Sequence, residues 1–202
     1  TRRSSDLAAF SYGSESIFRH LSLSVKTGEI VTITGRTGAG KSTLFKLILG
    51  LYAPKEGTIR VFGCKPADLS PALRRQVFGY VEQQFHDVAG TVGDQVTLKD
   101  PRVSEEAVEK ALRLVGLWDL CSALPEGLET PFRQEFFSRG QLQLLSIARA
   151  VVMNPRILLD EITANLDALT EQQVLTALQA ASQNRTVLSI SHRLYEAQGG
   201  RM

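Results

Sequence analysis

A glycine-rich loop at residues 35–42 constrains the fold of this chain more than any other segment. It reads Gly-Arg-Thr-Gly-Ala-Gly-Lys-Ser and matches the phosphate-binding pattern G-x-x-x-x-G-K-[ST]. Residues 30–34, Ile-Val-Thr-Ile-Thr, are all β-branched and predict a strand buried on both faces of a mainly parallel sheet. Residues 42–49 predict an amphipathic helix. Chance gives the pattern in on the order of one per cent of chains of this length, and the strand–loop–helix setting argues further against chance.

The chemistry of phosphate binding explains the residue types in this loop. Glycines let backbone N–H groups curl around the phosphates without obstruction by side chains. Lys41 can reach the β- and γ-phosphates, the Ser42 hydroxyl can ligate Mg²⁺, and the following helix aims its positive N-terminus at the anion. The predicted nucleotide-binding residues of the loop are Gly35, Arg36, Thr37, Gly38, Ala39, Gly40, Lys41, Ser42 and Thr43.

An apolar run that ends in two acids is a second candidate for the same site. Residues 157–159 are Ile-Leu-Leu, followed by Asp160 and Glu161. In phosphate-loop enzymes an Asp at the carboxyl end of a strand holds Mg²⁺. We therefore assign Asp160 to the metal and Glu161 to orienting or activating the attacking water. Taken alone, paired acids at a strand end more often begin a solvated loop, and the phosphate loop is what favours the functional interpretation.

Strand and helix patterns alternate along the chain. Strands are predicted at residues 21–25, 57–62, 156–160 and 185–191, a turn at residues 26–29, and helices at residues 104–124, 141–152 and 170–181. Ser104 is the expected N-cap of the first of these helices. Strands that alternate with helices imply an α/β fold with a parallel sheet.

Composition excludes several other classes of protein. The chain has 202 residues, 43% of them apolar, and a formal net charge of +2 without a dense Lys/Arg run, so we expect no nucleic-acid partner. Cys64 and Cys121 are far apart and outside any metal-ligand spacing, which favours a reducing compartment. No apolar run approaches the roughly 18–20 residues that span a bilayer. We expect the chain to be a piece of a longer polypeptide.

Further motifs, in order, resemble those of the ABC ATPase family. Residues 137–141, Phe-Ser-Arg-Gly-Gln, resemble the signature Leu-Ser-Gly-Gly-Gln, and residues 164–167, Ala-Asn-Leu-Asp, resemble the D-loop. Residues 191–194, Ser-His-Arg-Leu, resemble the switch-histidine segment, and residues 80–83, Tyr-Val-Glu-Gln, resemble the Q-loop. The resemblance covers residues 10–194 and rests on the ordered set, since each motif alone is only moderately specific.

The family resemblance implies a fold and a division of the chain. The fold is that of a P-loop NTPase, with a RecA-like core and a parallel sheet. One ABC ATPase domain would occupy residues 1–202, with the core at residues 1–83 and 154–202. An α-helical subdomain, residues 84–153, would be inserted between the two parts of the core. ATP and Mg²⁺ are the implied cofactors.

The resemblance also implies roles for individual residues. Tyr12 lies where the family stacks an aromatic ring on adenine, Gln83 would contact Mg²⁺ or the attacking water, and His192 would bond the γ-phosphate. Signature residues would contact the ATP held by a second cassette: Ser138, Gly140 and Gln141. The expected catalytic residues are Lys41, Gln83, Glu161 and His192, and the expected metal ligands are Ser42, Gln83 and Asp160. Any of these residues alone would have an ordinary structural interpretation.

Four departures from the family pattern stand out. Arg139 replaces the first signature glycine and adds bulk and charge near a shared nucleotide. The strand before Asp160 has three apolar residues where the family usually has four, which changes its register or shortens its lead-in. Residues 130–136 form a shorter segment than in most exporters. Only ten residues follow His192.

The leading functional hypothesis is ATP hydrolysis that powers transmembrane transport. Tyr12, the Ser-His-Arg-Leu segment and residues 90–92 favour export. The implied partners are a transmembrane domain and a second cassette in a head-to-tail dimer, at the cytoplasmic face of a membrane. Two alternatives stay open: a soluble ABC ATPase that acts on DNA or ribosomes, and a regulatory cassette that binds ATP with weak hydrolysis. The sequence names no transported substrate.

Overall fold

A parallel four-stranded sheet lies at the centre of the computed structural model, which describes residues 8–12, 15–36, 38–161 and 167–190. The strand order is β3-β7-β6-β5. The strands are β3 (Ile30–Thr32), β5 (Phe78–Val81), β6 (Ile157–Asp160) and β7 (Thr186–Ser189). A smaller antiparallel sheet, ordered β2-β1-β4, contains β1 (Ala8–Tyr12), β2 (Glu15–Leu21) and β4 (Glu56–Gly57). The α/β class with a parallel sheet is therefore confirmed.

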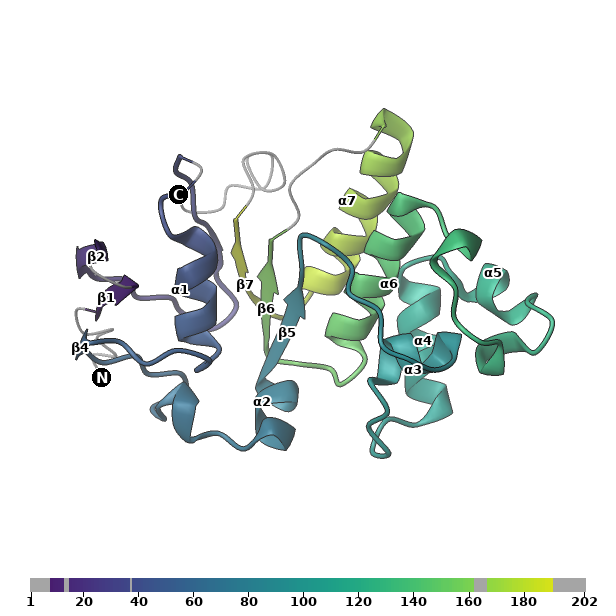
Figure 1. Cartoon of the computed structure of the whole chain (residues 1–202), viewed down its shortest axis with the longest axis horizontal. Helices are drawn as coiled ribbons and strands as arrows, with labels where there is room; N and C mark the ends of the chain where they lie inside the picture. Colours follow the sequence, from purple (N-terminus) through teal and green to yellow (C-terminus); the bar gives the residue numbers. More distant parts are fainter. Residues whose placement is uncertain (1–7, 13–14, 37, 162–166, 191–202) are drawn as a thin grey trace.

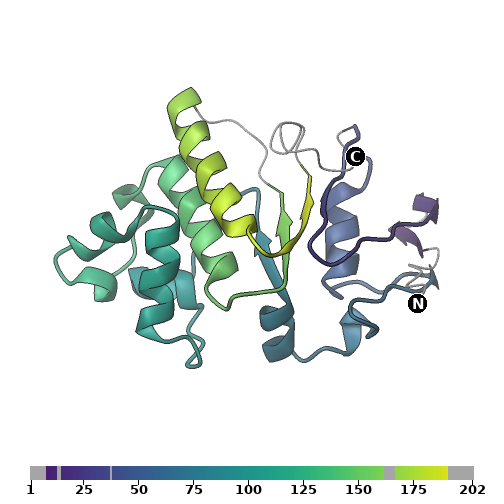
Figure 2. The same cartoon turned by 180° about the vertical axis from the view of Figure 1, so that it is seen from behind.

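Helices cover both faces of the parallel sheet. One face carries α1, and the other carries α6 and α7, as both views show (Figures 1 and 2). The α-helices are α1 (Lys41–Ile48), α2 (Pro71–Val77), α3 (Val92–Thr97), α4 (Glu105–Leu114), α5 (Trp118–Ser122), α6 (Arg139–Val151) and α7 (Ala168–Ser182). Short 3₁₀ turns are η1 (Pro66–Asp68), η2 (Gly127–Glu129) and η3 (Gln134–Phe136).

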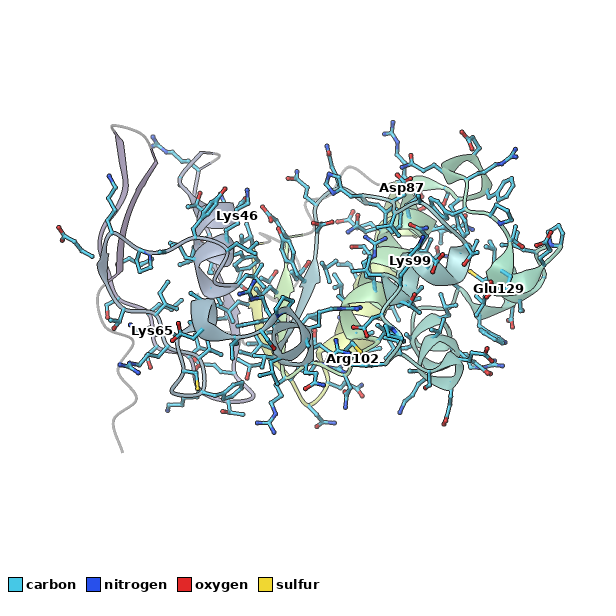
Figure 3. The ribbon with its side chains drawn as sticks, turned by 60° about the horizontal axis from the view of Figure 1, so that its bottom comes forward. Lys46, Lys65, Asp87, Lys99, Arg102 and Glu129 are labelled. Carbon is cyan, nitrogen blue, oxygen red and sulfur yellow. The ribbon has the colours of Figure 1, made fainter. Side chains whose placement is uncertain are left out.

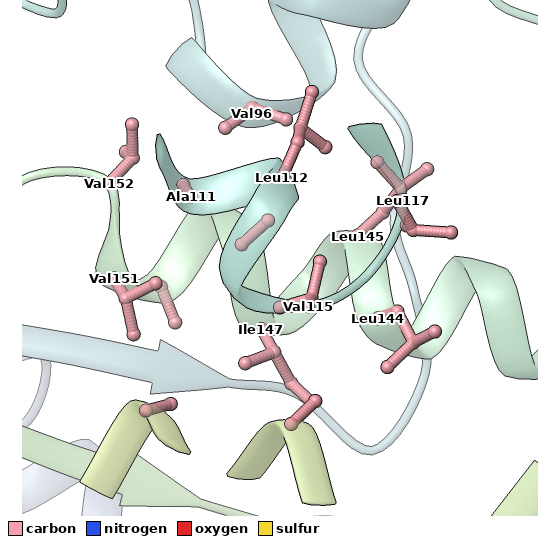
Figure 4. Packing of buried hydrophobic residues seen from close by; sticks show 14 of the residues in the cluster. Val96, Ala111, Leu112, Val115, Leu117, Leu144, Leu145, Ile147, Val151 and Val152 are labelled. Atoms are coloured by element: carbon pink, nitrogen blue, oxygen red, sulfur yellow. The ribbon is translucent and has the colours of Figure 1, made fainter. Parts of the chain in front are cut away.

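Successive side chains of β6 enter two different hydrophobic cores. Ile157 and Leu159 belong to a small cluster with Phe45 of α1. Leu158 belongs to a larger cluster that includes Leu145 of α6. Figure 4 shows the part of this larger cluster that surrounds α4 and α6. Because side chains alternate along a strand, we call the side of Ile157 and Leu159 the α1 face and the side of Leu158 the helical face.

Neighbouring strands agree with this assignment. Tyr80 of β5 is paired with Leu159 and packs against the α1-face cluster. One residue further along, Val81 is paired with Asp160 and belongs to the helical-face cluster. Asp160 is also paired with Ser189 of β7. Asp160 is thus in register with a residue of the helical face.

Two of the predicted strands are mostly wrong. Leu21 ends β2, and residues 22–26 are not in a strand, although residues 21–25 alternate between partly buried and exposed as predicted. In the predicted strand 57–62, only Gly57 is in one. The chain turns tightly there, because Val61 and Cys64 form an isolated bridge and Phe62 has a positive φ of 50°. Such backbone ends a strand.

The predicted helix at residues 104–124 is two helices. Ser104 caps α4 as expected, because its side chain accepts a hydrogen bond from the Ala107 N–H. The break between α4 and α5 falls at Gly116, whose φ is 75°. Left-handed backbone favours glycine and ends a helix. The prediction followed the apolar periodicity through Gly116, although this glycine is a signal for the end of a helix.

Exposed charges of both signs are spread over the molecule (Figure 3). The labelled residues, all exposed, are Lys46, Lys65, Asp87, Lys99, Arg102 and Glu129. None of the helices in the described part of the chain has both the length and the apolar composition needed to cross a membrane.

Candidate functional site

The phosphate loop connects β3 to α1 and folds around the Lys41 ammonium. Lys41 Nζ donates hydrogen bonds to the carbonyl oxygens of Gly35, at 2.8 Å, and Arg36, at 2.9 Å. Gly40 caps α1 with a left-handed backbone, φ 87°, which a side chain would strain. The loop thus holds the positively charged Lys41 ammonium at the N-terminus of α1. Thr37 lies outside the described residues.

Glu161 follows β6 and meets the phosphate loop directly. Its carboxylate accepts a hydrogen bond from the Ser42 hydroxyl. The same carboxylate accepts a second bond from the Tyr80 hydroxyl, at 2.5 Å. The Glu161 N–H donates to the Val81 carbonyl at 3.0 Å, which anchors the backbone to the neighbouring strand β5. Glu161 is only 7% exposed, so this cluster of oxygens is nearly enclosed by protein.

Asp160 has a different environment, although it is the adjacent residue. It is completely buried and accepts a hydrogen bond from the Ser189 hydroxyl at 2.9 Å. Its backbone carbonyl accepts from the Ile190 N–H at 2.8 Å. The structure therefore brings Ser42 and Glu161 together and turns Asp160 to the neighbouring strand β7.

Tyr80 is a site residue whose side chain was not predicted to take part. Burial and its bond to Glu161 raise the pKa of the Tyr80 phenol, because ionisation would place a second negative charge beside the carboxylate. Its aromatic ring packs edge-on against the ring of Phe45 in α1, with 6.3 Å between the two ring centroids. The sequence signal was present but weak: a Tyr in an apolar segment, directly before the Glu and Gln of the predicted Q-loop.

The signature segment forms the N-terminus of α6, on the sheet face away from α1 (Figure 1). Ser138 is the N-cap, and Ser138 and Gln141 form a capping box: the Gln141 N–H donates to the Ser138 hydroxyl, and the Ser138 N–H donates to the Gln141 side chain. Gly140 is buried, and a Cβ there would collide with Thr170 of α7. Arg139, by contrast, is exposed. The segment can therefore present a helix N-terminus to an anion.

Among the predicted residues outside the phosphate loop, Gln83, Tyr12 and His192 remain to be placed. Gln83 is exposed and lies just beyond β5. Tyr12 is the last residue of β1 and is paired with Glu15 of β2. Residues 162–166, which include most of the predicted D-loop, and His192 lie outside the described residues.

Comparison with known proteins identifies the family. The sequence model of the ABC transporter family matches residues 18–164, which include the phosphate loop and both acids. The chain belongs to the ABC transporter family. It is thus an ATP-binding domain of the ABC type, with the fold of a P-loop NTPase, and such domains are ATPases.

Similar ABC proteins are much longer than this chain. A probable multidrug resistance ABC transporter ATP-binding/permease protein, YheH of Bacillus subtilis (strain 168), is 37% identical over 89% of the chain and 27% of its own length. The alpha-hemolysin translocation ATP-binding protein HlyB of Proteus vulgaris is 41% identical over 88% of the chain and 26% of its own length. The chain spans about a quarter of each of these two relatives.

A solved structure of an ABC exporter has the same fold. A bacterial Atm1-family ABC exporter with ATP bound matches with a TM-score of 0.80 and 33% identity. The match covers 99% of this chain and 36% of the exporter chain.

The residues at the end of β6 suit the metal that accompanies ATP. Mg²⁺ prefers oxygen ligands, keeps several waters and is usually held by one or two carboxylates together with substrate phosphates. The Ser42 hydroxyl and the Glu161 carboxylate are such ligands and touch each other. Within the described ranges no group of three or more His, Cys, Asp or Glu could hold a metal ion by itself. The arrangement thus fits a metal that arrives with a nucleotide.

Proposed function

We propose that this chain is the nucleotide-binding domain of an exporter and that its ATP hydrolysis powers transport. The observation that carries the proposal is the contact between Ser42, at the start of α1, and Glu161, at the end of β6. It joins the phosphate loop to an acid 119 residues further along the chain, as a site for a metal-bound nucleotide requires. Export is supported by the relatives that are named as translocation proteins and by the exporter with the same fold.

A division of the chain into two parts supports the same proposal. The sheet strands lie at residues 30–32, 78–81, 157–160 and 186–189, while residues 84–153 contain α3 to α6. We therefore assign residues 1–83 and 154–202 to a core and residues 84–153 to a helical subdomain. The helical face of the sheet and the helices of the subdomain share one large hydrophobic core. This shared packing would limit how far the subdomain can move relative to the core of residues 1–83 and 154–202.

Phosphate binding is assigned to the loop and its lysine. Lys41 would exchange its bonds to the loop carbonyls for bonds to the β- and γ-phosphates, and the loop amides would supply the remaining donors. The Ser42 hydroxyl and an acid at the end of β6 would hold Mg²⁺, which neutralises charge on the phosphates when bound. Tyr12, Gln83 and His192 keep the roles that the family resemblance implies.

Two chains would be needed for a complete site. Lys41 and Ser138 lie on helices on opposite sides of the sheet, so one chain does not bring the signature helix to its own phosphate loop. We propose a head-to-tail pair of cassettes, each of which offers the Ser138 end of α6 to the other's ATP. In the longer protein a transmembrane domain would hold the pair together and raise its effective concentration, at the cytoplasmic face of a membrane.

Dilution of the protein tests this proposal. Turnover per chain with saturating MgATP should rise with protein concentration and then level off, over a hundredfold dilution series. A Lys41→Ala variant should bind ATP roughly 10–100-fold more weakly, because it loses one charge-assisted bond while the loop amides remain. A flat specific activity with only monomer present by light scattering would contradict the paired site. Equal ATP affinity in the variant would contradict the phosphate loop.

A further inference from the structure

The two adjacent acids at the end of β6 point to opposite faces of the sheet. We propose that Glu161, and not Asp160, is the carboxylate that holds the magnesium ion of MgATP in this chain. The inference rests on the proposed nucleotide site and settles which of its two acids meets the metal. Its basis is the alternation of side chains along β6 and the contacts at the end of that strand.

Glu161 lies on the face where the phosphate loop is. Ile157 and Leu159, two and four residues before Glu161, pack in the cluster with Phe45 of α1. Strand alternation continues that face to residue 161, and the hydrogen bond from the Ser42 hydroxyl to Glu161 confirms it. A metal held by the Ser42 hydroxyl therefore has the Glu161 carboxylate as its neighbour.

Asp160 lies in register with the helical face of the sheet. Leu158, two residues before it, packs in the cluster with Leu145 of α6. The cross-strand partner Val81 belongs to the same cluster. The Asp160 carboxylate accepts a bond from the Ser189 hydroxyl, which ties β6 to β7. We assign Asp160 the structural role of joining the two central strands on the helical face.

The length of the strand explains the exchange. The run before Asp160 has three apolar residues, where the family pattern has four. The side-chain period of a strand is two, so the loss of one residue moves every following side chain to the other face. The second acid then occupies the position that the first would otherwise take. Residue 162, which follows the metal carboxylate in the sequence, is Ile instead of an acid.

A matched pair of isosteric variants tests the assignment. ATP affinity is measured by calorimetry with excess Mg²⁺ and again with EDTA, and the ratio of the two affinities gives the metal-dependent gain. Glu161→Gln should lower this gain by about tenfold or more. Asp160→Asn should leave it unchanged, because the amide oxygen still accepts the Ser189 bond. As a direct probe of the metal, the EPR spectrum of Mn²⁺ with a non-hydrolysable ATP analogue should change only in the Glu161→Gln protein.

The outcomes separate this inference from the function it rests on. A wild-type chain without metal-dependent ATP binding would contradict the proposed function itself. With that binding present, loss of the gain in Asp160→Asn would overturn the inference, whether or not Glu161→Gln also loses it. An unchanged gain in Glu161→Gln would overturn it as well. Circular dichroism of both variants shows whether the sheet has been kept.

An insertion tests the cause. One leucine added between Leu158 and Leu159 should return Asp160 to the α1 face and give it the contact with Ser42. In this background, Asp160→Asn should lower the metal-dependent gain, and Glu161→Gln should no longer do so. A gain that still depended on Glu161 in the folded insertion variant would overturn the register argument. The two point variants carry the test whether or not the insertion variant folds.

Discussion

The two faces of the parallel sheet differ in how much they bury and in what they expose. The helical face, with α6 and α7, belongs to the larger hydrophobic core, and its polar residues Asp160 and Ser189 bond to each other. The α1 face has the smaller core, and its polar residues Ser42, Tyr80 and Glu161 meet at the end of the strands beside the phosphate loop. The comparison indicates that both faces contribute a hydrophobic core, while only the α1 face also positions the chemistry of the candidate site.

Truncation of one core residue on each face should separate these roles. Phe45→Ala should lower the free energy of unfolding by about 3–5 kcal/mol and Leu145→Ala by about 2–5 kcal/mol, since both side chains are completely buried. Only Phe45→Ala should also weaken MgATP binding, because Phe45 packs edge-on against Tyr80. Urea unfolding and calorimetry measure the two quantities. Equal losses of ATP affinity in the two folded variants would contradict the assignment of the nucleotide site to the α1 face alone.

Tyr80→Phe should have a smaller effect, confined to the α1 face. Loss of the hydroxyl removes one hydrogen bond to Glu161 and should lower the free energy of unfolding by about 1–3 kcal/mol. The effect should also depend on pH. The pKa of Tyr80 is raised above its ordinary value of 10.0, so above about pH 10 the unfolded chain releases a proton that the folded chain keeps.

The sign of this pH dependence can be measured. The stabilisation due to Tyr80 is fully present below about pH 10 and decreases as the pH rises further. The difference in unfolding free energy between wild type and Tyr80→Phe should therefore shrink above that pH, while other tyrosines and lysines cancel in the difference. A difference in unfolding free energy that stays constant up to pH 11 would contradict the buried contact between the Tyr80 hydroxyl and Glu161.

Ser138→Ala should have the smallest effect on stability and acts on the helical side. The variant loses the hydroxyl that accepts from the Gln141 N–H, and caps of this kind contribute about 1 kcal/mol. Binding of MgATP to a single chain should not change, because Ser138 would contact only the partner's nucleotide. Ser138→Thr, which can keep the cap, is the control. An altered ATP affinity in a dilute, monomeric protein would place Ser138 in its own chain's site.

Short-range patterns predicted much of the fold. The β-branched run ending in the glycine loop gave β3 and α1 nearly to their ends, and apolar periodicity gave α6 and α7. Buried runs gave β6 and β7. These elements have their apolar residues at a clear period and recognisable signals at their ends, which is where sequence patterns are informative.

What the sequence did not predict depends on neighbours that are distant in the chain. Strand β5 was missed, because the pairing of Tyr80 with Leu159 that makes it a strand comes from a residue far along the chain. The collision that keeps Gly140 a glycine involves Thr170 of another helix. Packing between elements decides such positions, and local propensity cannot.

The alternation of β6 has an evolutionary consequence. Successive side chains of a strand lie on opposite faces of the sheet. The insertion or deletion of one residue therefore moves every following side chain to the other face, although the active-site residues themselves are unchanged. Residues 160 and 161, Asp and Glu, can each serve as a carboxylate in whichever environment they enter. In the register that we propose, Glu161 faces the phosphate loop, and in the alternative register Asp160 would take that place, so two adjacent acids would supply one carboxylate to the loop in both cases.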